Sequence, residues 1–290
     1  MRPVFVAGPV SWNTLVLLDR LPEPVPHMQF AEADWQSLGG TSAGKALSLR
    51  ALGRDVHLHT VVGADEAGAR IRAALVHAGI TVWGGASGAS ERHLNLMTAA
   101  GERVSLYLSA AAALDGPVDP DVVAAMARSA AIVIDLSAEG LRLLPTAREV
   151  SADSGVPIWV DLHDYDGEAA FHRPFLEAAD AVLCSRDRLP DPVLFLRRCI
   201  AGGARLAVCT RGADGAIALD ADGGIHEVPA APADVVDTNG AGDAFFAGLL
   251  DAVLDERDLD AALRAAAAAA VPVLGSRHLH PLLDDLVLRP

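Results

Sequence analysis

One short segment combines small residues, two carboxylates and the start of an apolar helix. It spans residues 237–243, reads Asp-Thr-Asn-Gly-Ala-Gly-Asp, and runs into a helical stretch over 244–254. The amides of Gly240, Ala241 and Gly242 at a helix N-terminus can converge on a phosphate oxygen, because the helix dipole attracts negative charge and glycine lets the backbone come close. Asp243 stands beside them, where it could take the proton from an attacking hydroxyl. The segment predicts an anion hole next to a general base.

An arbitrary Gly-x-Gly-Asp sequence is more often a tight turn with a capping aspartate. Here the sequence continues with Ala244 and Phe245 and then with Ala-Gly at 247–248. The whole segment resembles the C-terminal signature of the ribokinase, or PfkB, family of carbohydrate kinases. The resemblance implies an ATP-dependent kinase that phosphorylates a hydroxyl of a small sugar or sugar-like acceptor, with Asp243 as the base.

Other segments follow in the order that this family shows, from Gly8 after the first strand to residues 62–68. By this resemblance, Mg²⁺ would bridge the nucleotide phosphates, and Asp237 would organise the anion-hole loop, in some relatives around a monovalent cation. The implied ATP contacts are Thr210, Gly212, Gly215, Asn239 and Asp237. The implied acceptor pocket contains Asn13, Gly39, Gly40, Gly44 and Lys45.

The chain departs from the family pattern at three places. Asn13 stands where an aspartate is common, and Gly44 replaces the asparagine of the Gly-Gly-x-x-x-Asn motif. The Asn-x-x-Glu motif that acts near Mg²⁺ would fall at 185–188, which leaves Asp187 as a substitute metal contact. Lys45, the only lysine of the chain, either points into the acceptor cleft or is a solvated helix residue, and the sequence leaves both open.

Residues 39–45 also fit the first seven positions of a P-loop, Gly-x-x-x-x-Gly-Lys. Position eight is Ala46, where a P-loop needs Ser or Thr for Mg²⁺, and residues 31–38 are a poor candidate for the preceding buried strand. A P-loop is therefore disfavoured.

Apolar runs rich in Val and Ile alternate with stretches of helical period, which predicts an α/β fold with a mainly parallel, doubly wound sheet flanked by helices. Ligands bind such sheets beyond the carboxyl ends of the strands, where the polar loop 163–166 also falls. Two extended segments, near 13–38 and 91–109, interrupt the alternation and predict a small β-lid on a single ribokinase-like domain over 1–290. The clearest strands are 130–136, 158–162, 181–184 and 206–210, and the helices are 43–52, 67–78, 120–129, 138–154, 192–201, 242–254 and 259–271.

The composition of the chain limits which classes of partner and which location we expect. A net charge of −15 disfavours nucleic acid and anionic membrane surfaces. The longest apolar run is mostly alanine, too weak for a membrane span, and the first residues lack a secretory signal. Three cysteines without metal-type spacing suit a reducing compartment, so we expect a cytoplasmic location. Exposed lid strands could pair with a second copy into a homodimer.

Two rival functions stay open. A nucleoside kinase would use the same scaffold, with Trp12, Trp35 or Tyr107 stacking on a base. A non-catalytic ligand-binding protein would explain the altered motifs, although a pure binder has no need of a base beside an anion hole.

Overall fold

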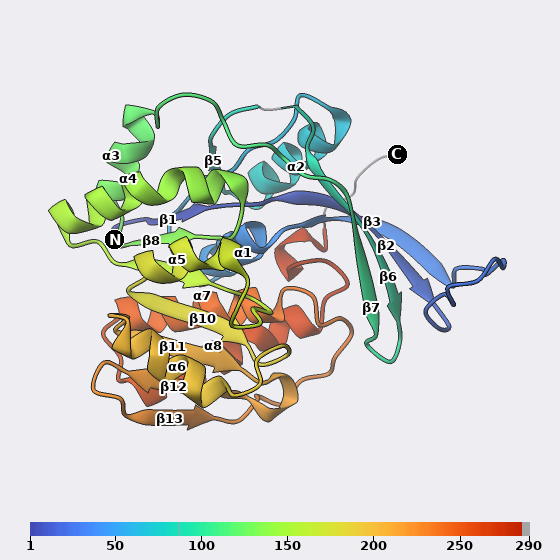
Figure 1. Ribbon diagram of the computed structural model, residues 1–290. Helices are drawn as coiled ribbons and strands as arrows, with labels where there is room; N and C mark the ends of the chain where they lie inside the picture. Colours follow the sequence, from blue (N-terminus) through green and yellow to red (C-terminus); the bar gives the residue numbers. More distant parts are fainter. Residues whose placement is uncertain (87, 286–290) are drawn as a thin grey trace.

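The computed structural model describes residues 1–86 and 88–285 and contains a large sheet covered by helices on both faces (Figure 1). The sheet has the strand order β13-β12-β11-β10-β9-β8-β1-β4-β5, parallel from β5 to β11 and antiparallel at β12 and β13. This arrangement confirms the predicted ribokinase-like α/β class. Its strands are β1 (Val4–Ala7), β4 (Val56–His59), β5 (Thr81–Trp83), β8 (Ala131–Ile134), β9 (Ile158–Asp161), β10 (Ala181–Ser185), β11 (Leu206–Thr210), β12 (Ala216–Asp220) and β13 (Ile225–Val228).

The alternation of side chains along β1 explains why both faces of the sheet are covered. Val4 and Val6 belong to one hydrophobic cluster, whereas Phe5 and Ala7 belong to the other, and all four are fully buried. Successive strand residues point to opposite faces, so a central strand that is apolar throughout needs a helical layer on each side. One layer contains α1 (Thr41–Ala51), α2 (Glu66–His77), α7 (Ala241–Leu254) and α8 (Leu259–Leu274), and the other contains α3 (Pro120–Arg128), α4 (Ala138–Ser154), α5 (Arg173–Ala178) and α6 (Pro192–Ala201).

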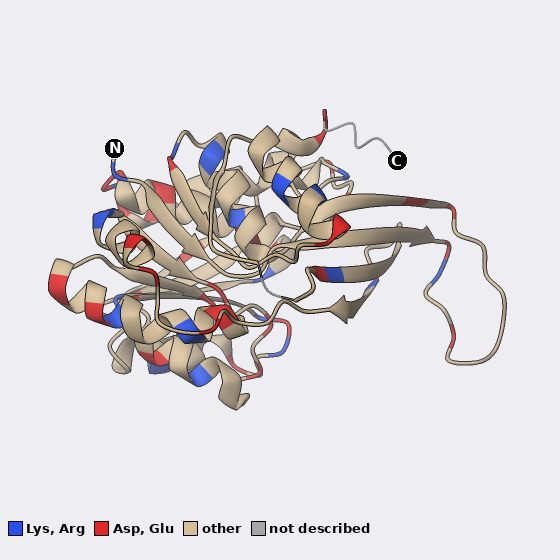
Figure 2. Ribbon diagram, turned by 90° about the horizontal axis from the view of Figure 1, so that it is seen from above, with Lys and Arg blue, Asp and Glu red and all other residues tan. Residues whose placement is uncertain are grey.

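The two extended segments form a second sheet of four strands, the lid sheet, in the order β3-β2-β6-β7. These strands are β2 (Ser11–Leu18), β3 (Ala33–Gly39), β6 (Glu91–Thr98) and β7 (Arg103–Ser109). Residues 91–109 form the predicted hairpin. Its turn is closed by the N–H of Thr98, which donates to the carbonyl oxygen of Glu102 at 3.0 Å. Figure 2 shows this sheet projecting from the main body, with Lys and Arg positions scattered among the Asp and Glu positions. Within the described residues, no helix has the length and apolarity needed to cross a membrane.

Candidate active site

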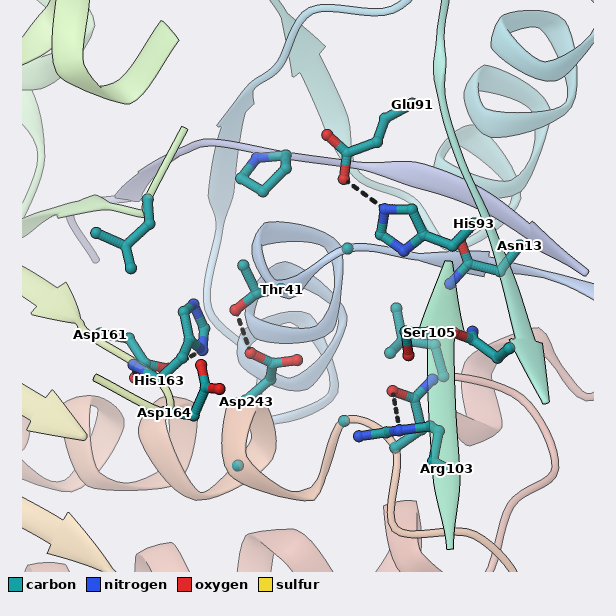
Figure 3. A pocket seen from close by; sticks show the side chains of 18 of the residues that line it. Asn13, Thr41, Glu91, His93, Arg103, Ser105, Asp161, His163, Asp164 and Asp243 are labelled. Carbon is teal, nitrogen blue, oxygen red and sulfur yellow. Dashed lines mark hydrogen bonds and ion pairs between the residues drawn. The ribbon is translucent and has the colours of Figure 1, made fainter. Parts of the chain in front are cut away.

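A cavity of about 480 Å³ lies between the lid sheet and the carboxyl edge of the main sheet. Figure 3 shows Asp243 on one side of it and lid side chains such as His93 and Ser105 on the other. Of the predicted site residues, Asn13, Gly40, Asn239, Gly240, Gly242 and Asp243 line this cavity. The fold therefore brings the expected base, the turn before it and part of the expected acceptor pocket together.

The turn before α7 has the backbone that an anion hole needs. Gly240 has φ +79°, and a Cβ there would lie 2.8 Å from the carbonyl oxygen of Leu279, so both conformation and space require glycine. The Ala241 amide does not fit the prediction, because it donates to the carbonyl of Thr238 at 3.3 Å. Gly242 follows in the first turn, where amides have no acceptor within the helix. Gly240 and Gly242 are thus the better candidates for phosphate contacts.

Asp237 and Asn239 stabilise this turn from its N-terminal side. The Asn239 amide donates to Oδ1 of Asp237 at 2.9 Å, and Asp237 is buried. Arg103, from lid strand β7, donates to Oδ1 of Asn239 at 3.3 Å. The predicted role of Asp237 in organising the loop is consistent with these contacts, which also connect the lid to the turn.

Asp243 is held by α1 through a single oxygen. The hydroxyl of Thr41 donates to Oδ1 at 2.5 Å, and the ammonium of Lys45 contacts the same Oδ1 at 3.0 Å. Burial raises the pKa of Asp243 above its usual value, while Lys45, His163 and the Thr41 hydroxyl oppose that rise. Because both contacts occupy Oδ1, the second oxygen, Oδ2, is the one left to accept a proton from a hydroxyl in the cavity.

Lys45 lies in neither of the two positions that the sequence left open. Its side chain is fully buried beneath the cavity, so it is neither a solvated helix residue nor part of the cavity lining. Its ammonium contacts Oδ1 of Asp135 at 3.0 Å and Oδ2 of Asp161 at 3.1 Å, in addition to Asp243. Burial alone would lower the pKa of Lys45, but the attraction of the three carboxylates outweighs it and raises the pKa, so the side chain stays charged.

Asp161 ends β9 and His163 follows it at the carboxyl edge, and both line the cavity. The backbone amide of His163 donates to Oδ1 of Asp161 at 3.0 Å, and its Nδ1 lies 3.4 Å from Oδ2. Burial would raise the pKa of Asp161, but His163 and Lys45 oppose this strongly enough to lower it. Asp164 also lines the cavity, whereas Asp166 does not and instead pairs with Arg188. The loop is therefore part of the site.

The lid contributes a polar wall because side chains alternate between the two faces of its strands, apart from an irregularity between Arg92 and His93. Residues 91, 93 and 95 of β6 and 103, 105 and 107 of β7 line the cavity, and register pairs His93 with Tyr107 and Asn95 with Ser105. The leucines and valine between them face away from it. His93 forms a hydrogen bond with Glu91 at 2.9 Å, and its ring contacts that of Tyr107 at a tilt, with centroids 4.0 Å apart and planes at 46°.

Asn13 completes this wall from β2 and depends on Gly39. A Cβ at Gly39 would lie 2.1 Å from Nδ2 of Asn13, so glycine at this position makes room for the amide. Oδ1 of Asn13 is buried and has no hydrogen-bond partner among residues 1–86 and 88–285. A buried amide oxygen without a partner is costly unless a ligand satisfies it, so Asn13 suits an acceptor hydroxyl.

Several predicted residues lie away from the cavity. Thr210, Gly212 and Gly215 belong to the tight loop between β11 and β12, where Gly215 has φ +84° and a Cβ would collide with the Val228 carbonyl. Gly44 lies behind Asp243. Asp187 is exposed in the loop after β10, and its role with metal stays a prediction.

Three aromatic residues were expected to stack on the nucleobase of a nucleoside acceptor, and they lie on both sides of the lid. Trp12 is 5% exposed, and its indole N–H donates to Gln36 at 3.2 Å. Trp35 donates to the carbonyl of Arg277 at 3.2 Å. Neither lines the cavity, which leaves Tyr107 as the aromatic residue in its wall.

Several polar residues of the site were not predicted, because they meet only in three dimensions. Asp161 ends a buried strand, which was a usable signal, and the period-two pattern of 91–109 could have marked its polar members as well as its apolar ones. Thr41 and Asp135 carried no local signal. The missed set is Thr41, Glu91, His93, Asn95, Arg103, Ser105, Asp135 and Asp161.

The sequence model described as pfkB family carbohydrate kinase matches residues 192–283. The chain is 30% identical over 273 residues to acarbose 7(IV)-phosphotransferase of Actinoplanes sp., covering 92% of this chain and 90% of that protein. A solved microbiome-derived acarbose kinase superimposes with a TM-score of 0.83 at 30% identity, covering 95% of this chain and 93% of that one. Arabidopsis thaliana ribokinase complexed with ribose and ATP shares the fold, with a TM-score of 0.80 at 18% identity and 99% of each chain covered.

Proposed function

Because the chain belongs to the PfkB family of carbohydrate kinases, and so transfers phosphate from ATP to a hydroxyl of a sugar or nucleoside, we propose that its acceptor is a neutral sugar and its base Asp243. The acceptor hydroxyl loses its proton to Oδ2 of Asp243 while its oxygen bonds to the γ-phosphorus and the bond to ADP breaks. The amides of Gly240 and Gly242 stabilise the charge on the transferred group.

The charge and polarity of the cavity support a neutral polyhydroxylated acceptor. Four carboxylates line it, Glu91, Asp161, Asp164 and Asp243, against one arginine, Arg103. A phosphorylated acceptor would be repelled by this lining, whereas sugar hydroxyls can donate to the carboxylates and to Oδ1 of Asn13. The unsatisfied Asn13 oxygen is the observation that carries the proposal.

A nucleoside acceptor is the second candidate, on the strength of Tyr107. Its ring lines the cavity and already contacts the ring of His93 at a tilt of 46°. A nucleobase would have to stack on Tyr107 beside this contact or displace His93 from it.

ATP is expected to contact the segment containing Thr210, Gly212 and Gly215, and the turn containing Asn239 and Asp237. Mg²⁺ would neutralise the phosphate charge when bound, and a single carboxylate with phosphate oxygens and water suffices to hold it, so Asp187 at the carboxyl edge fits as a contact. A monovalent cation beside Asp237 is a further prediction. Replacing K⁺ by Na⁺ or by tetramethylammonium in the assay tests it.

We also propose that residues 1–290 act as one kinase domain. A cytoplasmic location is supported by three buried free cysteines, Cys184, Cys199 and Cys209.

The lid face turned away from the cavity exposes Val104, Leu106 and Leu108, with exposed fractions of 40, 45 and 53%. An apolar row on an edge strand favours pairing with a second copy. Light scattering of the wild type against a variant with Leu106 and Leu108 changed to Ser tests the homodimer.

The defining experiment measures ADP release from Mg·ATP with neutral sugars including acarbose, sugar phosphates and nucleosides. Turnover with neutral sugars that falls by about 10²-fold or more in Asp243→Asn supports the proposal. Preference for nucleosides or sugar phosphates refutes the assigned acceptor, and full activity of Asp243→Asn refutes the assigned base. Asn13→Ala should raise the acceptor KM more than the KM for ATP.

A further inference from the structure

Lys45 occupies a place that acceptor binding does not explain. It projects from α1 beneath the cavity, is fully buried, and contacts carboxylates from three other elements. Asp135 follows β8, Asp161 ends β9 and Asp243 begins α7. The ring of Phe246 lies below the ammonium, 5.0 Å from Nζ to its centroid. A buried charge with this many partners is costly to assemble, so its contact with the base calls for a reason.

The contacts fix one specific atom of the base. Lys45 and Thr41 hold the same oxygen of Asp243, Oδ1, and the ammonium of Lys45 also donates to the Thr41 hydroxyl. With Oδ1 held on two sides, the carboxylate plane cannot turn freely. Oδ2 is then directed consistently, as proton transfer from a bound hydroxyl requires.

We propose that Lys45 is a positioning residue that fixes the orientation and the ionised state of the base Asp243. This rests on the proposed function, because Asp243 must act as a base for the role to matter. Lys45 does not touch the acceptor, and its effect passes through Asp243. The proton taken by Oδ2 neutralises that carboxylate, and Lys45 remains charged throughout.

The surroundings of Asp243 determine what loss of Lys45 does. Lys45 faces it from α1 and Asp161 from β9, while His163 and Asp164 stand in the loop after β9. Asp135 lies on the far side of the ammonium. Without Lys45, three buried carboxylates face one another across the place of its ammonium, with the ring of His163 beside Asp161. One of them will protonate more readily, and the acid limb of the rate profile must move to higher pH.

The first test compares the pH dependence of kcat in the wild type and in Lys45→Met, which keeps the length and apolar stem of the side chain. We expect kcat at neutral pH to fall by about tenfold or more and the acid midpoint to rise by about one pH unit or more. The acceptor KM should change little.

Arg54→Met is the matched control. Arg54 is also buried, and its Nε contacts Oδ1 of Asp251 at 2.5 Å, so it too attaches to α7, but at the opposite end from Asp243. A merely structural ion pair would behave alike at both places. We expect Arg54→Met to lose stability without moving the pH profile.

A second variant tests whether an added amine can restore the lost activity. In Lys45→Ala the lost side chain leaves room for a small cation, and methylammonium should restore kcat by about tenfold, whereas tetramethylammonium at equal ionic strength should not. No difference between the two amines, together with an unmoved acid midpoint in Lys45→Met, overturns the proposal.

Because Lys45 is the only lysine, lysine labelled with ¹³C at Cε gives one resonance and a readout that needs no turnover. We expect an acid titration step in the wild type that is missing in Asp243→Asn. Identical titrations in the two proteins refute the contact as a functional one. A wild type that phosphorylates no acceptor defeats the proposed function instead, while turnover with an unmoved pH profile in Lys45→Met defeats only the role of Lys45.

Discussion

Replacing Gly44 with alanine would place a methyl group against the proposed base. Gly44 lies in the first turn of α1, next to Lys45 in the sequence, and its Cα faces the side chain of Asp243. A Cβ there would lie 2.4 Å from Oδ2 of Asp243 and 2.8 Å from its Cβ. Ordinary contact begins at 3.4 Å, so one of the two groups must move.

Two opposing contributions determine how Gly44→Ala changes the free energy of unfolding. Alanine in place of glycine inside a helix stabilises by about 0.5–1 kcal/mol when nothing is in the way. Forcing a methyl into a packed site costs about 1–3 kcal/mol. The collision involves the first turn of a well-packed helix on one side and a carboxylate held by Lys45 on the other, so we expect the cost to win. Net destabilisation should be about 1–2 kcal/mol.

The kinetic effect should be larger than the loss of stability suggests. The overlap with Oδ2 is about 1 Å, and a displacement of that size at a reacting group can reduce kcat by about 10²-fold. Saturating acceptor and Mg·ATP isolate kcat, and urea unfolding gives the stability. Gly275→Ala is the control, because its Cβ would meet nothing closer than 3.7 Å. A Gly44→Ala protein that is more stable than wild type and keeps its kcat would refute the placement of Asp243 against α1.

Three further predictions concern the elements around the site. Arg54→Met should cost about 2–4 kcal/mol in urea unfolding, because it leaves a partly buried carboxylate on α7 without its partner. Arg103→Ala should lower kcat about tenfold, more at low than at high salt, because its guanidinium is the one arginine that lines the cavity and reaches Asn239. Asp65→Ala should cost about 1–2 kcal/mol at pH 7, because Asp65 caps α2 and binds the amide and hydroxyl of Ser90, contacts that lower its pKa to about 2.

The pH dependence of the Asp65 effect has a defined sign. The pKa is depressed on folding from 3.8, so the stabilisation is present above that value and disappears as the pH falls toward 2. The difference between wild type and Asp65→Ala should therefore shrink between pH 4 and pH 2. An unchanged difference, a salt-independent Arg103→Ala, or an Arg54→Met protein as stable as wild type would each contradict the corresponding contact.

The fold was predictable because its periodicities are local. Helices over 138–154 and 192–201 and the strand over 206–210 occur where the pattern predicted them, since an apolar face must be buried whatever its partner. The hairpin of β12 and β13 was not predicted, because β13 contains the polar pair His226 and Glu227 and so lacks the continuous apolar run that marks the predicted strands of this sheet.

The candidate site was predictable only where one segment makes it. The turn at 237–243 can be recognised from the order of its own residues, so Asp243 could be proposed as the base from sequence, and the structure places it in the cavity. The partners of Lys45 could not be. Asp135 and Asp161 are neighbours only because β8 and β9 lie side by side in the sheet, and a helix N-terminus approaches them from the other end of the chain.

The charge around the base explains how an acidic site can accept a nucleotide phosphate. Asp135, Asp161 and Asp243 would together repel the γ-phosphoryl if all three faced the cavity with full effect. Lys45 lies within 3.1 Å of an oxygen of each, so its single charge reduces the field of all three at once. In the proposed reaction, the amides of Gly240 and Gly242 then act on the phosphoryl group against a weaker opposing field. A lysine in the acceptor pocket could not do this, because solvent and ligand would screen it from Asp135, which is fully buried away from the cavity.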